Sequence, residues 1–165
     1  MKYQYPISKK MPTETEHKYL INIKAWKSIK PYKSFKIKQA YLNNEPYKTI
    51  RIRIANNKGF ITIKGIAKGS TRPEFEYEIP VKEADELINL CCTNIIEKVR
   101  HLVIHDNKKW EVDEFKGLNK GLFIAEIELA NENEKYSIPD WVEQNVTKDQ
   151  RYANSNLIAK PFSTW

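Results

Sequence analysis

The sequence predicts a mainly β protein of the α+β class: an eight-stranded antiparallel closed β-barrel with a charged interior and a few helices packed outside. Three observations support this fold class. Apolar and polar residues alternate with period two in short runs, which is typical of β-strands. Charged residues of one sign gather on single strands. The opposite faces of the same strands are too apolar to remain bare.

The alternating runs give eight expected strands, at residues 13–21, 35–42, 48–55, 59–65, 74–80, 97–106, 108–115 and 122–129. The spacing of apolar residues predicts a helix over residues 82–96, and Pro139 predicts the start of another over residues 139–146. A chain of 165 residues has the usual size of one domain. We therefore expect a single domain over residues 1–165, with residues 1–10 as a candidate loosely ordered extension.

Positive charges gather on three of the expected strands. Because successive side chains of a strand point to opposite faces, residues two positions apart share a face. The cations concerned are Arg51 and Arg53 in one strand, Lys64 in the next, and Lys98 and Arg100 in a third. A solvated face would mix the two signs, since pairing between strands favours opposite charges. The segregation of charge therefore indicates a face that binds ions.

Negative charges follow the same rule on other strands. The carboxylates that share a face within their strand are Glu14 and Glu16 (with Lys18), Glu74, Glu76 and Glu78, Glu111 and Asp113, and Glu126 and Glu128. The apolar faces must be covered, so the charged faces turn inward when the sheet closes into a barrel. A barrel of about eight strands can hold a small ligand. Burying so many charges is tolerable only if ligand, metal and water neutralise and solvate them.

The two kinds of charge together indicate the chemistry of the ligand. Guanidinium and ammonium groups bind phosphate oxygens. Clustered carboxylates bind hard cations such as Mg²⁺ or Mn²⁺, which often bridge to substrate phosphates. The formal net charge of +7 also favours an anionic partner. The barrel interior is therefore predicted to bind a complex of divalent metal and polyphosphate.

Several other features exclude competing classes. His101 and His105 lie in a strand-like run without an HExxH pattern, which favours a surface or turn role over zinc binding. No run approaches the length of a membrane span, and the first ten residues lack the apolar core of a signal peptide. Cys91 and Cys92 stand in an apolar run, which suits reduced thiols. We expect a cytoplasmic protein without a membrane or nucleic-acid partner.

Blocks of the sequence, taken in order, resemble the CYTH domain family, also called triphosphate tunnel metalloenzymes. The segment "ETEHK" matches the family signature ExExK, and the later blocks are "QAYL", "IRIRI", "TIKG", "RPEFEYEIP", "EKVR", "WEVDEF", "GLFIAEIEL", "PDWV" and "VTKDQRYANSNL". They run from Thr13 to Leu157. The resemblance implies an eight-stranded barrel whose tunnel binds triphosphate compounds with Mg²⁺ or Mn²⁺, with about two ions per site.

The resemblance also implies roles for individual residues. The metal-binding carboxylates would be Glu14, Glu16, Glu126 and Glu128, with Glu74, Glu76 and Asp113 as further acidic residues of the tunnel. The phosphate-binding residues would be Lys18, Arg51, Arg53, Lys64, Lys98 and Arg100, with Arg151 and Tyr152 at the tunnel mouth. Lys18, Glu16 and Glu128 are the candidate catalytic residues. Glu143 and Asn145 depart from the family pattern, which leaves open a lid or helix-end contact near them.

The resemblance implies a divalent-metal-dependent hydrolase that cleaves inorganic triphosphate to pyrophosphate and phosphate, with nucleoside and thiamine triphosphates as further substrates. Two alternatives stay open. An adenylate cyclase of the same fold would bind ATP in the same tunnel, and a non-catalytic module would only bind polyphosphate or an RNA end. Few helices are available to cover a whole barrel, so we also expect a homodimer.

Overall fold

The structure is a computed structural model that describes residues 12–45, 47–91 and 94–165. The strands are β1 (Thr13–Ile21), β2 (Lys33–Glu45), β3 (Lys48–Ala55), β4 (Lys58–Lys64), β5 (Thr71–Ile79), β6 (Ile96–His105), β7 (Lys108–Phe115), β8 (Phe123–Glu128) and β9 (Val142–Asn145). The helices are α1 (Ile23–Trp26), α2 (Val81–Leu90) and α3 (Asn154–Ala159). Three short 3₁₀ turns, η1 (Gly117–Asn119), η2 (Gln150–Tyr152) and η3 (Phe162–Thr164), complete the described elements.

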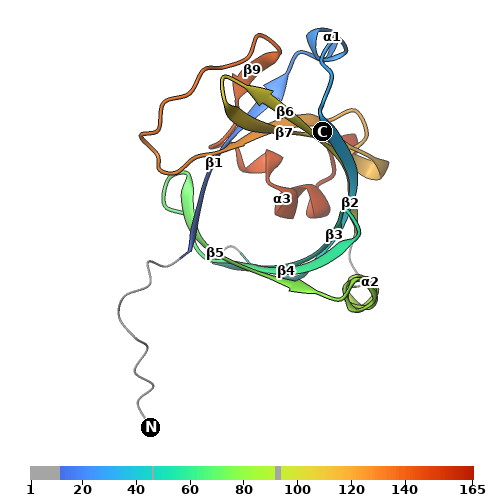
Figure 1. Ribbon diagram of the computed structural model, residues 1–165. Coiled ribbons are helices and arrows are strands. Elements are labelled where there is room, and N and C mark those ends of the chain that lie inside the picture. The colour runs from blue at the N-terminus through green and yellow to red at the C-terminus, as the bar shows by residue number, and fades with distance from the viewer. Residues whose placement is uncertain (1–11, 46, 92–93) are drawn as a thin grey trace.

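Eight strands close into an antiparallel barrel. Their order is β5-β4-β3-β2-β6-β7-β8-β1, and β1 pairs again with β5 to complete the ring. Figure 1 looks along this ring, with α2 outside the wall beside β4. Each of the eight runs expected to be a strand forms one. The predicted fold class, a mainly β closed barrel, is confirmed.

Tight turns explain why two of the hairpins form where they do. Asn56 and Asn57 connect β3 to β4, and Asp106 and Asn107 connect β6 to β7. All four residues have positive φ angles. Two-residue hairpin loops require this backbone conformation, and Asn and Asp tolerate it better than most other residues. These loops fix the register in which the charged positions of neighbouring strands meet.

The barrel has a seam along one edge of β1. Thr13, Glu14 and Thr15 pair with β5, whereas Tyr19 and Ile21 pair with β9. The helix predicted over residues 139–146 is therefore wrong, because its central residues form β9. The reason is that β5 leaves the upper part of β1 with unpaired backbone groups, and a strand can satisfy them. The burial of Trp141 also favours this position, because its ring packs against Trp26.

Helix α2 is shorter than predicted. Ala84 and Ile88 lie one turn apart and pack on Ile52 of β3, and the helix reaches only to Leu90. The apolar Ile96, expected in the helix, instead begins β6 and is buried. Gly59 permits the close approach of α2 to β4, because a Cβ atom there would lie 2.8 Å from that of Ala84.

Of the two cysteines expected to be reduced thiols, Cys91 lies within the described residues. Cys91 is half-buried, and its thiol donates a hydrogen bond to the Leu87 carbonyl. Cys92 lies outside the described residues.

Two apolar clusters hold the charged part of the barrel in place. Outside the wall, aromatic rings pack between β1, α1, β7 and the segment before β9; they are Tyr19, Trp26, Trp110 and Trp141. Inside one end of the barrel, an apolar floor is formed by Leu20, Tyr41, Ile96, Phe115, Leu122, Ile124, Leu157 and Ile158. The last two belong to α3, which lies within the outline of the ring in Figure 1. Charged side chains therefore occupy only part of the interior.

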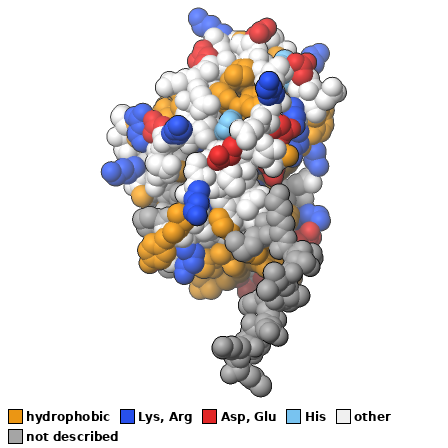
Figure 2. Space-filling model, turned by 90° about the vertical axis from the view of Figure 1, so that its left-hand side faces the viewer, with side chains coloured by type: hydrophobic (Ala, Val, Ile, Leu, Met, Phe, Trp, Pro, Cys, Tyr) orange, Lys and Arg blue, Asp and Glu red, His pale blue; other side chains and the backbone are white. Residues whose placement is uncertain are grey.

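The helices leave some of the outer wall uncovered. Figure 2 shows hydrophobic side chains gathered toward the bottom of one face of the molecule. Tyr77, on the outer side of β5, is 57% exposed. In the part of the chain that the structure describes, no helix is long and apolar enough to cross a membrane.

Candidate functional site

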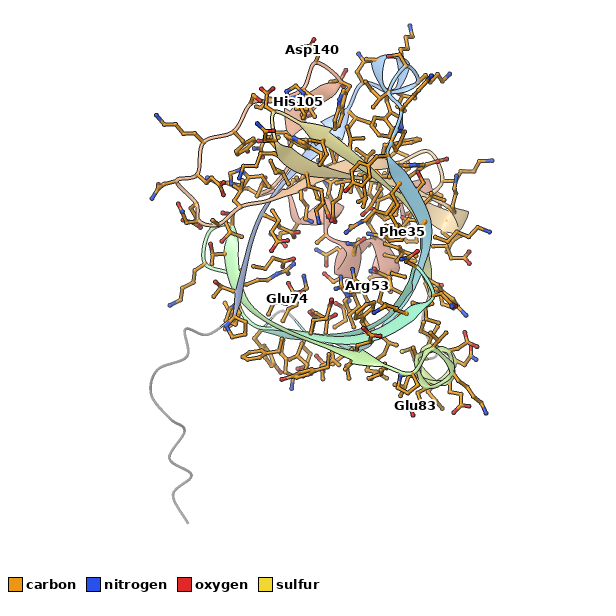
Figure 3. The ribbon with its side chains drawn as sticks, viewed as in Figure 1. Phe35, Arg53, Glu74, Glu83, His105 and Asp140 are labelled. Carbon is orange, nitrogen blue, oxygen red and sulfur yellow. The ribbon has the colours of Figure 1, made fainter. Side chains whose placement is uncertain are left out.

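The barrel encloses a cavity of about 380 Å³. Its charged lining residues are Glu14, Glu16, Lys18, Arg51, Arg53, Lys64, Arg72, Glu74, Glu76, Arg100, Glu111, Glu126, Glu128 and Asp149. Figure 3 shows Arg53 of β3 and Glu74 of β5 pointing into the ring, whereas Glu83 of α2 points away from it. The side chains reach one space because the two-residue period of each strand turns alternate residues inward.

Most of the residues proposed from the sequence meet in this cavity. Those that line it are Glu14, Glu16, Lys18, Arg51, Arg53, Lys64, Glu74, Glu76, Arg100, Glu126 and Glu128. The other four, Lys98, Asp113, Arg151 and Tyr152, are not among its lining residues.

One wall of the cavity is cationic and is organised around Glu76. Arg53 donates two hydrogen bonds to the Glu76 carboxylate, of 3.0 and 2.9 Å. Arg51 donates to the same carboxylate at 3.3 Å and to the Thr62 hydroxyl at 3.1 Å. Burial and the neighbouring Arg51 lower the pKa of Arg53 to about 10, so the Arg53 guanidinium group stays charged at neutral pH. Two arginines thus share one carboxylate, and Arg51 also lies 3.9 Å from Glu74.

The seam between β1 and β5 carries a mixed group of charges. Glu14 accepts hydrogen bonds from Lys64 at 2.7 Å and from Arg72 at 2.9 Å. Burial alone would raise the pKa of Glu14, but Lys64 and Arg72 hold it well below its usual range. Burial and the nearby Glu14 raise the pKa of Glu74 to about 6. The ionised Glu14 thus faces a second carboxyl group that holds its proton more tightly than usual.

Lys18 lies between two carboxylates farther along β1. Its ammonium group is 2.8 Å from Glu16 and also donates a hydrogen bond to Glu126. Burial would lower the pKa of Lys18, but Glu126 and Glu16 raise it above its ordinary value. Arg100 binds the other Glu126 oxygen at 2.8 Å. These ion pairs hold Lys18 and Arg100 charged and fixed at the cavity surface.

Lys98 and Asp113 form a buried ion pair behind Arg100. Their side chains are 2.5 Å apart, and the residues are 2% and 0% exposed. Asp113 also accepts two hydrogen bonds of 2.7 Å from Arg100. Burial lowers the pKa of Lys98 to about 8, although Asp113 opposes that shift. Lys98 further contacts Asn154 of α3 at 3.3 Å, so the pair links the barrel wall to the closing helix.

Arg151 is held outside the cavity. Its guanidinium group binds the Asp149 carboxylate at 2.6 Å and lies over the Trp165 ring, 5.4 Å from the ring centroid. Tyr152 packs against the same ring. In this arrangement Asp149, not Arg151, reaches the cavity lining.

Glu128 differs from the other carboxylates of the site. It lies directly opposite Glu16 in the pairing of β1 and β8. Among the described residues, no cation lies within ion-pair distance of Glu128, whereas Glu16 contacts both Lys18 and Arg72. Burial raises the pKa of Glu128, and the negative charges of Glu14, Glu111 and Glu16 raise it further. Lys109 opposes this shift only from beyond ion-pair distance, so the site contains a carboxylate with no ion-pair partner among the described residues.

The described residues contain no group of three or more His, Cys, Asp or Glu side chains already arranged to hold a metal ion. The ion pairs explain the arrangement, because most carboxylates of the cavity point toward lysine and arginine groups. The donor set is nevertheless made of carboxylate oxygens, which are the ligands that Mg²⁺ and Mn²⁺ prefer.

Sequence reasoning missed several residues of the cavity lining. Arg72 was overlooked because the strand was expected to begin at residue 74, although Arg72 is two positions before Glu74 and shares its face. Glu111 was placed on an anionic face but was given no role in the site. Thr147 and Asn154 come from the segments after β8. No local pattern predicts that these segments return to the barrel, because tertiary packing of α3 brings them there.

Comparison with known proteins agrees with this geometry. The chain matches the sequence model of the CYTH domain family over residues 12–160. It is 43% identical over 156 residues to an inorganic triphosphatase of Acetivibrio thermocellus, covering 94% of this chain and 99% of the relative. It is 29% identical over 126 residues to an inorganic triphosphatase of Nitrosomonas europaea, covering 73% of this chain and 82% of that protein.

A solved crystal structure of an inorganic triphosphatase superposes on this chain with a TM-score of 0.61 and 26% sequence identity, covering 90% of this chain and 95% of the other. The similarity thus extends over the barrel and the segments that line its cavity. Both the match to the family model and the 43% identity extend over most of the chain. The chain belongs to the CYTH domain family.

Proposed function

We propose that this protein is a divalent-metal-dependent hydrolase that cleaves inorganic triphosphate to pyrophosphate and phosphate. Nucleoside and thiamine triphosphates are further candidate substrates. The observation that carries the proposal is that a cationic wall and a set of carboxylates face one cavity inside the barrel. The two relatives named as inorganic triphosphatases support the same reaction.

The cationic residues of the cavity are proposed to bind the phosphate chain. Arg51, Arg53, Lys64 and Arg100 line the cavity together with Lys18. Guanidinium groups fit phosphate oxygens in pairs, and each charge-assisted hydrogen bond contributes about 1.5–3 kcal/mol. Lys98 does not contact the phosphate itself in this proposal. It shares Asp113 with Arg100 and so helps to hold the Arg100 guanidinium in place. Arg151 joins the site only if it leaves Asp149.

The carboxylates are proposed to hold Mg²⁺ or Mn²⁺, with about two ions per site. Like charges directly opposite each other on neighbouring strands are destabilising. Two such pairs, Glu16 with Glu128 and Glu111 with Glu126, occur side by side across β1, β8 and β7. The predicted metal ligands are Glu14, Glu16, Glu74, Glu76, Glu126 and Glu128. Asp113 does not line the cavity, but it holds Arg100, which in turn binds Glu126. When bound, the metal neutralises phosphate charge and lowers the pKa of a water ligand.

The chain's own residues then position and activate the reactants. Lys18 and the arginines hold the terminal phosphoryl group, and they stabilise the negative charge that develops as water attacks its phosphorus atom. Glu128 is suited to accept a proton from this water, because its pKa is raised and no described cation pairs with it. Glu16 fixes Lys18 through their ion pair. The bond to the bridging oxygen breaks and pyrophosphate leaves, without a covalent intermediate on the protein.

An adenylate cyclase and a non-catalytic receptor are the competing functions. Purified protein is incubated with inorganic triphosphate, ATP or thiamine triphosphate and Mg²⁺ or Mn²⁺, and the products are identified by ³¹P NMR and chromatography. Orthophosphate together with pyrophosphate supports the hydrolase. Pyrophosphate with cyclic AMP would indicate the cyclase, and binding without turnover would indicate the receptor.

Three further properties are proposed. The apolar outer wall beside Tyr77 supports a homodimer, which analytical ultracentrifugation tests. A cytoplasmic location is proposed as well, and fractionation of cells tests it. A single domain over the chain agrees with the family match over residues 12–160, and one cooperative unfolding transition would support it.

A further inference from the structure

Arg72 occupies an unusual position in the barrel. It lies on β5, directly opposite Glu14 in the short pairing that closes the ring. That pairing joins only three residues of β1 to β5, namely Thr13, Glu14 and Thr15. Arg72 therefore stands where the barrel seam meets the cavity.

The side chain of Arg72 spans the two carboxylates of the ExExK segment. Its Nε donates to Glu14 Oε2 at 2.9 Å, and its Nη2 donates to Glu16 Oε1 at 3.3 Å. Within the described part of the chain, no other cation is in ion-pair contact with both of these carboxylates. Lys64 contacts Glu14 at 2.7 Å and Lys18 contacts Glu16 at 2.8 Å.

Arg72 is also more exposed than the lysines beside it. Its side chain is 30% exposed, compared with 9% for Lys64 and 12% for Lys18. Its described hydrogen bonds go only to Glu14 and Glu16. The guanidinium group thus has solvent beside it and, among the described residues, no third hydrogen-bond partner.

We propose that Arg72 is a resident counter-ion, which neutralises Glu14 and Glu16 while no divalent metal is bound and releases them when the metal arrives. This inference rests on the proposed metal-dependent function. A guanidinium fork and a divalent cation seek the same carboxylate oxygens, so each must displace the other. The apparent metal affinity is then reduced by the fraction of molecules in which Arg72 holds the carboxylates.

A purely structural role for Arg72 predicts something different. If its only task is to fasten β1 to β5, replacing it weakens the fold equally with and without metal. If Arg72 is a counter-ion, replacing it changes the metal affinity, and the loss of stability is smaller when metal is bound. Arginine and lysine also differ here, because lysine keeps the positive charge but cannot span two carboxylates with a planar fork.

The test is a titration of the full chain with Mn²⁺ in the absence of triphosphate. Isothermal titration calorimetry measures the Mn²⁺ affinity. Arg72→Gln removes a guanidinium group that competes with Mn²⁺ through two charge-assisted hydrogen bonds. This variant should therefore bind Mn²⁺ at least about tenfold more tightly than wild type. Arg72→Lys should also bind more tightly than wild type, by a smaller factor. Lys58→Gln is the matched control, because Lys58 pairs with Glu78 outside the cavity lining, and its affinity should stay within about twofold of wild type.

Melting temperatures provide a second readout. Without metal, Arg72→Gln should melt lower than wild type, and saturating Mn²⁺ should raise its midpoint by more than it raises that of wild type. An equal loss with and without Mn²⁺, or a Mn²⁺ affinity no tighter than wild type, would overturn the inference.

The lysine variant decides the question if Arg72→Gln does not fold. An unchanged affinity in Arg72→Lys would mean that only the general positive field matters, and the counter-ion role would be wrong. These results leave the proposed hydrolase intact if wild type binds Mn²⁺ and cleaves triphosphate. A wild-type protein that binds no Mn²⁺ either alone or together with triphosphate would overturn both proposals.

Discussion

Glu16 and Glu128 lie directly opposite each other on β1 and β8, and both side chains line the cavity. Glu16 is compensated by Lys18 and Arg72, whereas Glu128 has no ion-pair partner among the described residues. A protein that needed only stability would not place two carboxylates together in a partly buried space. The pair is best explained by a cation that binds with the substrate.

Replacing Glu128 by Gln should separate function from stability. The variant removes a carboxylate whose pKa is raised by burial and by neighbouring acidic groups, so its metal-free melting temperature should be unchanged or higher. Metal-dependent turnover should fall at least about a hundredfold, as expected for loss of a general base. Melting curves and phosphate release with Mg²⁺ measure the two effects.

Ile127→Asn is the matched control for this prediction. Ile127 follows the same strand but points to the outer cluster, where it is 0% exposed. Its loss should cost roughly 2–5 kcal/mol of unfolding free energy. A Glu128→Gln protein that melts much lower yet turns over normally would mean that the inward face of β8 has been misassigned.

Replacing Arg51 or Arg53 by Ala should raise the KM for triphosphate strongly. Each lost charge-assisted contact with phosphate costs about 1.5–3 kcal/mol, which is about ten- to a hundredfold in affinity. Lys36→Ala provides the comparison, because Lys36 is exposed and is not a lining residue of the cavity. It should change mainly the salt dependence of binding. Equal losses in both variants would contradict the assignment of the cationic wall.

Lys98→Met tests whether the buried ion pair acts through stability. Removing Lys98 leaves Asp113 buried with Arg100 as its remaining partner. Breaking a buried pair in this way should lower the unfolding free energy by about 3 kcal/mol. The stability loss should appear with and without triphosphate, and KM should rise only modestly, because Lys98 affects the phosphate only through Arg100. A large rise in KM with unchanged stability would instead make Lys98 a direct phosphate ligand, as the sequence suggested.

Glu74 should make the metal-free protein less stable as pH rises from about 4.5 to 6. Its folded-state pKa, about 6, lies above the ordinary value of 4.5, so the folded protein binds the proton more tightly than the unfolded chain does. Stability from this group is therefore complete below pH 4.5 and is lost as pH rises through 6.

Glu74→Gln should remove this loss while keeping a hydrogen-bond donor beside Glu14. One pKa unit corresponds to about 1.36 kcal/mol. The difference in unfolding free energy between wild type and Glu74→Gln should therefore change by at most about 2 kcal/mol across this pH range, and by less where solvent screens the group. Denaturant unfolding at several pH values measures it. A wild-type curve that rises relative to the variant across this window would contradict the assignment.

The eight strands were predictable because strand periodicity is local. The alternation in "TIRIRIA" or "EFEYEI" fixes which side chains share a face, and the barrel then brings those faces together. This explains why Arg51, Arg53 and Glu76 meet as expected. The positive-φ pairs Asn56–Asn57 and Asp106–Asn107 are equally local, so the hairpins could be anticipated from the sequence.

The remaining features depend on tertiary contacts. The segment 142–145 forms a strand because β1 offers an unpaired edge, although its own residues resembled a helix. Lys98 and Asp113 share the charged face of their strands, but α3 and the apolar floor cover that depth of the barrel. The period of a strand predicts which way a side chain points. It does not predict whether water, a ligand or a helix lies in front of it.

The most direct test of the account is a crystal structure of the protein with Mn²⁺ and a non-hydrolysable imido analogue of triphosphate. The proposed site requires an anomalous Mn²⁺ peak within coordination distance of Glu16 or Glu128, and a phosphate chain bound by Arg51 and Arg53. Mn²⁺ and phosphate bound together outside the barrel, or a cavity that holds neither at saturating concentrations, would contradict it.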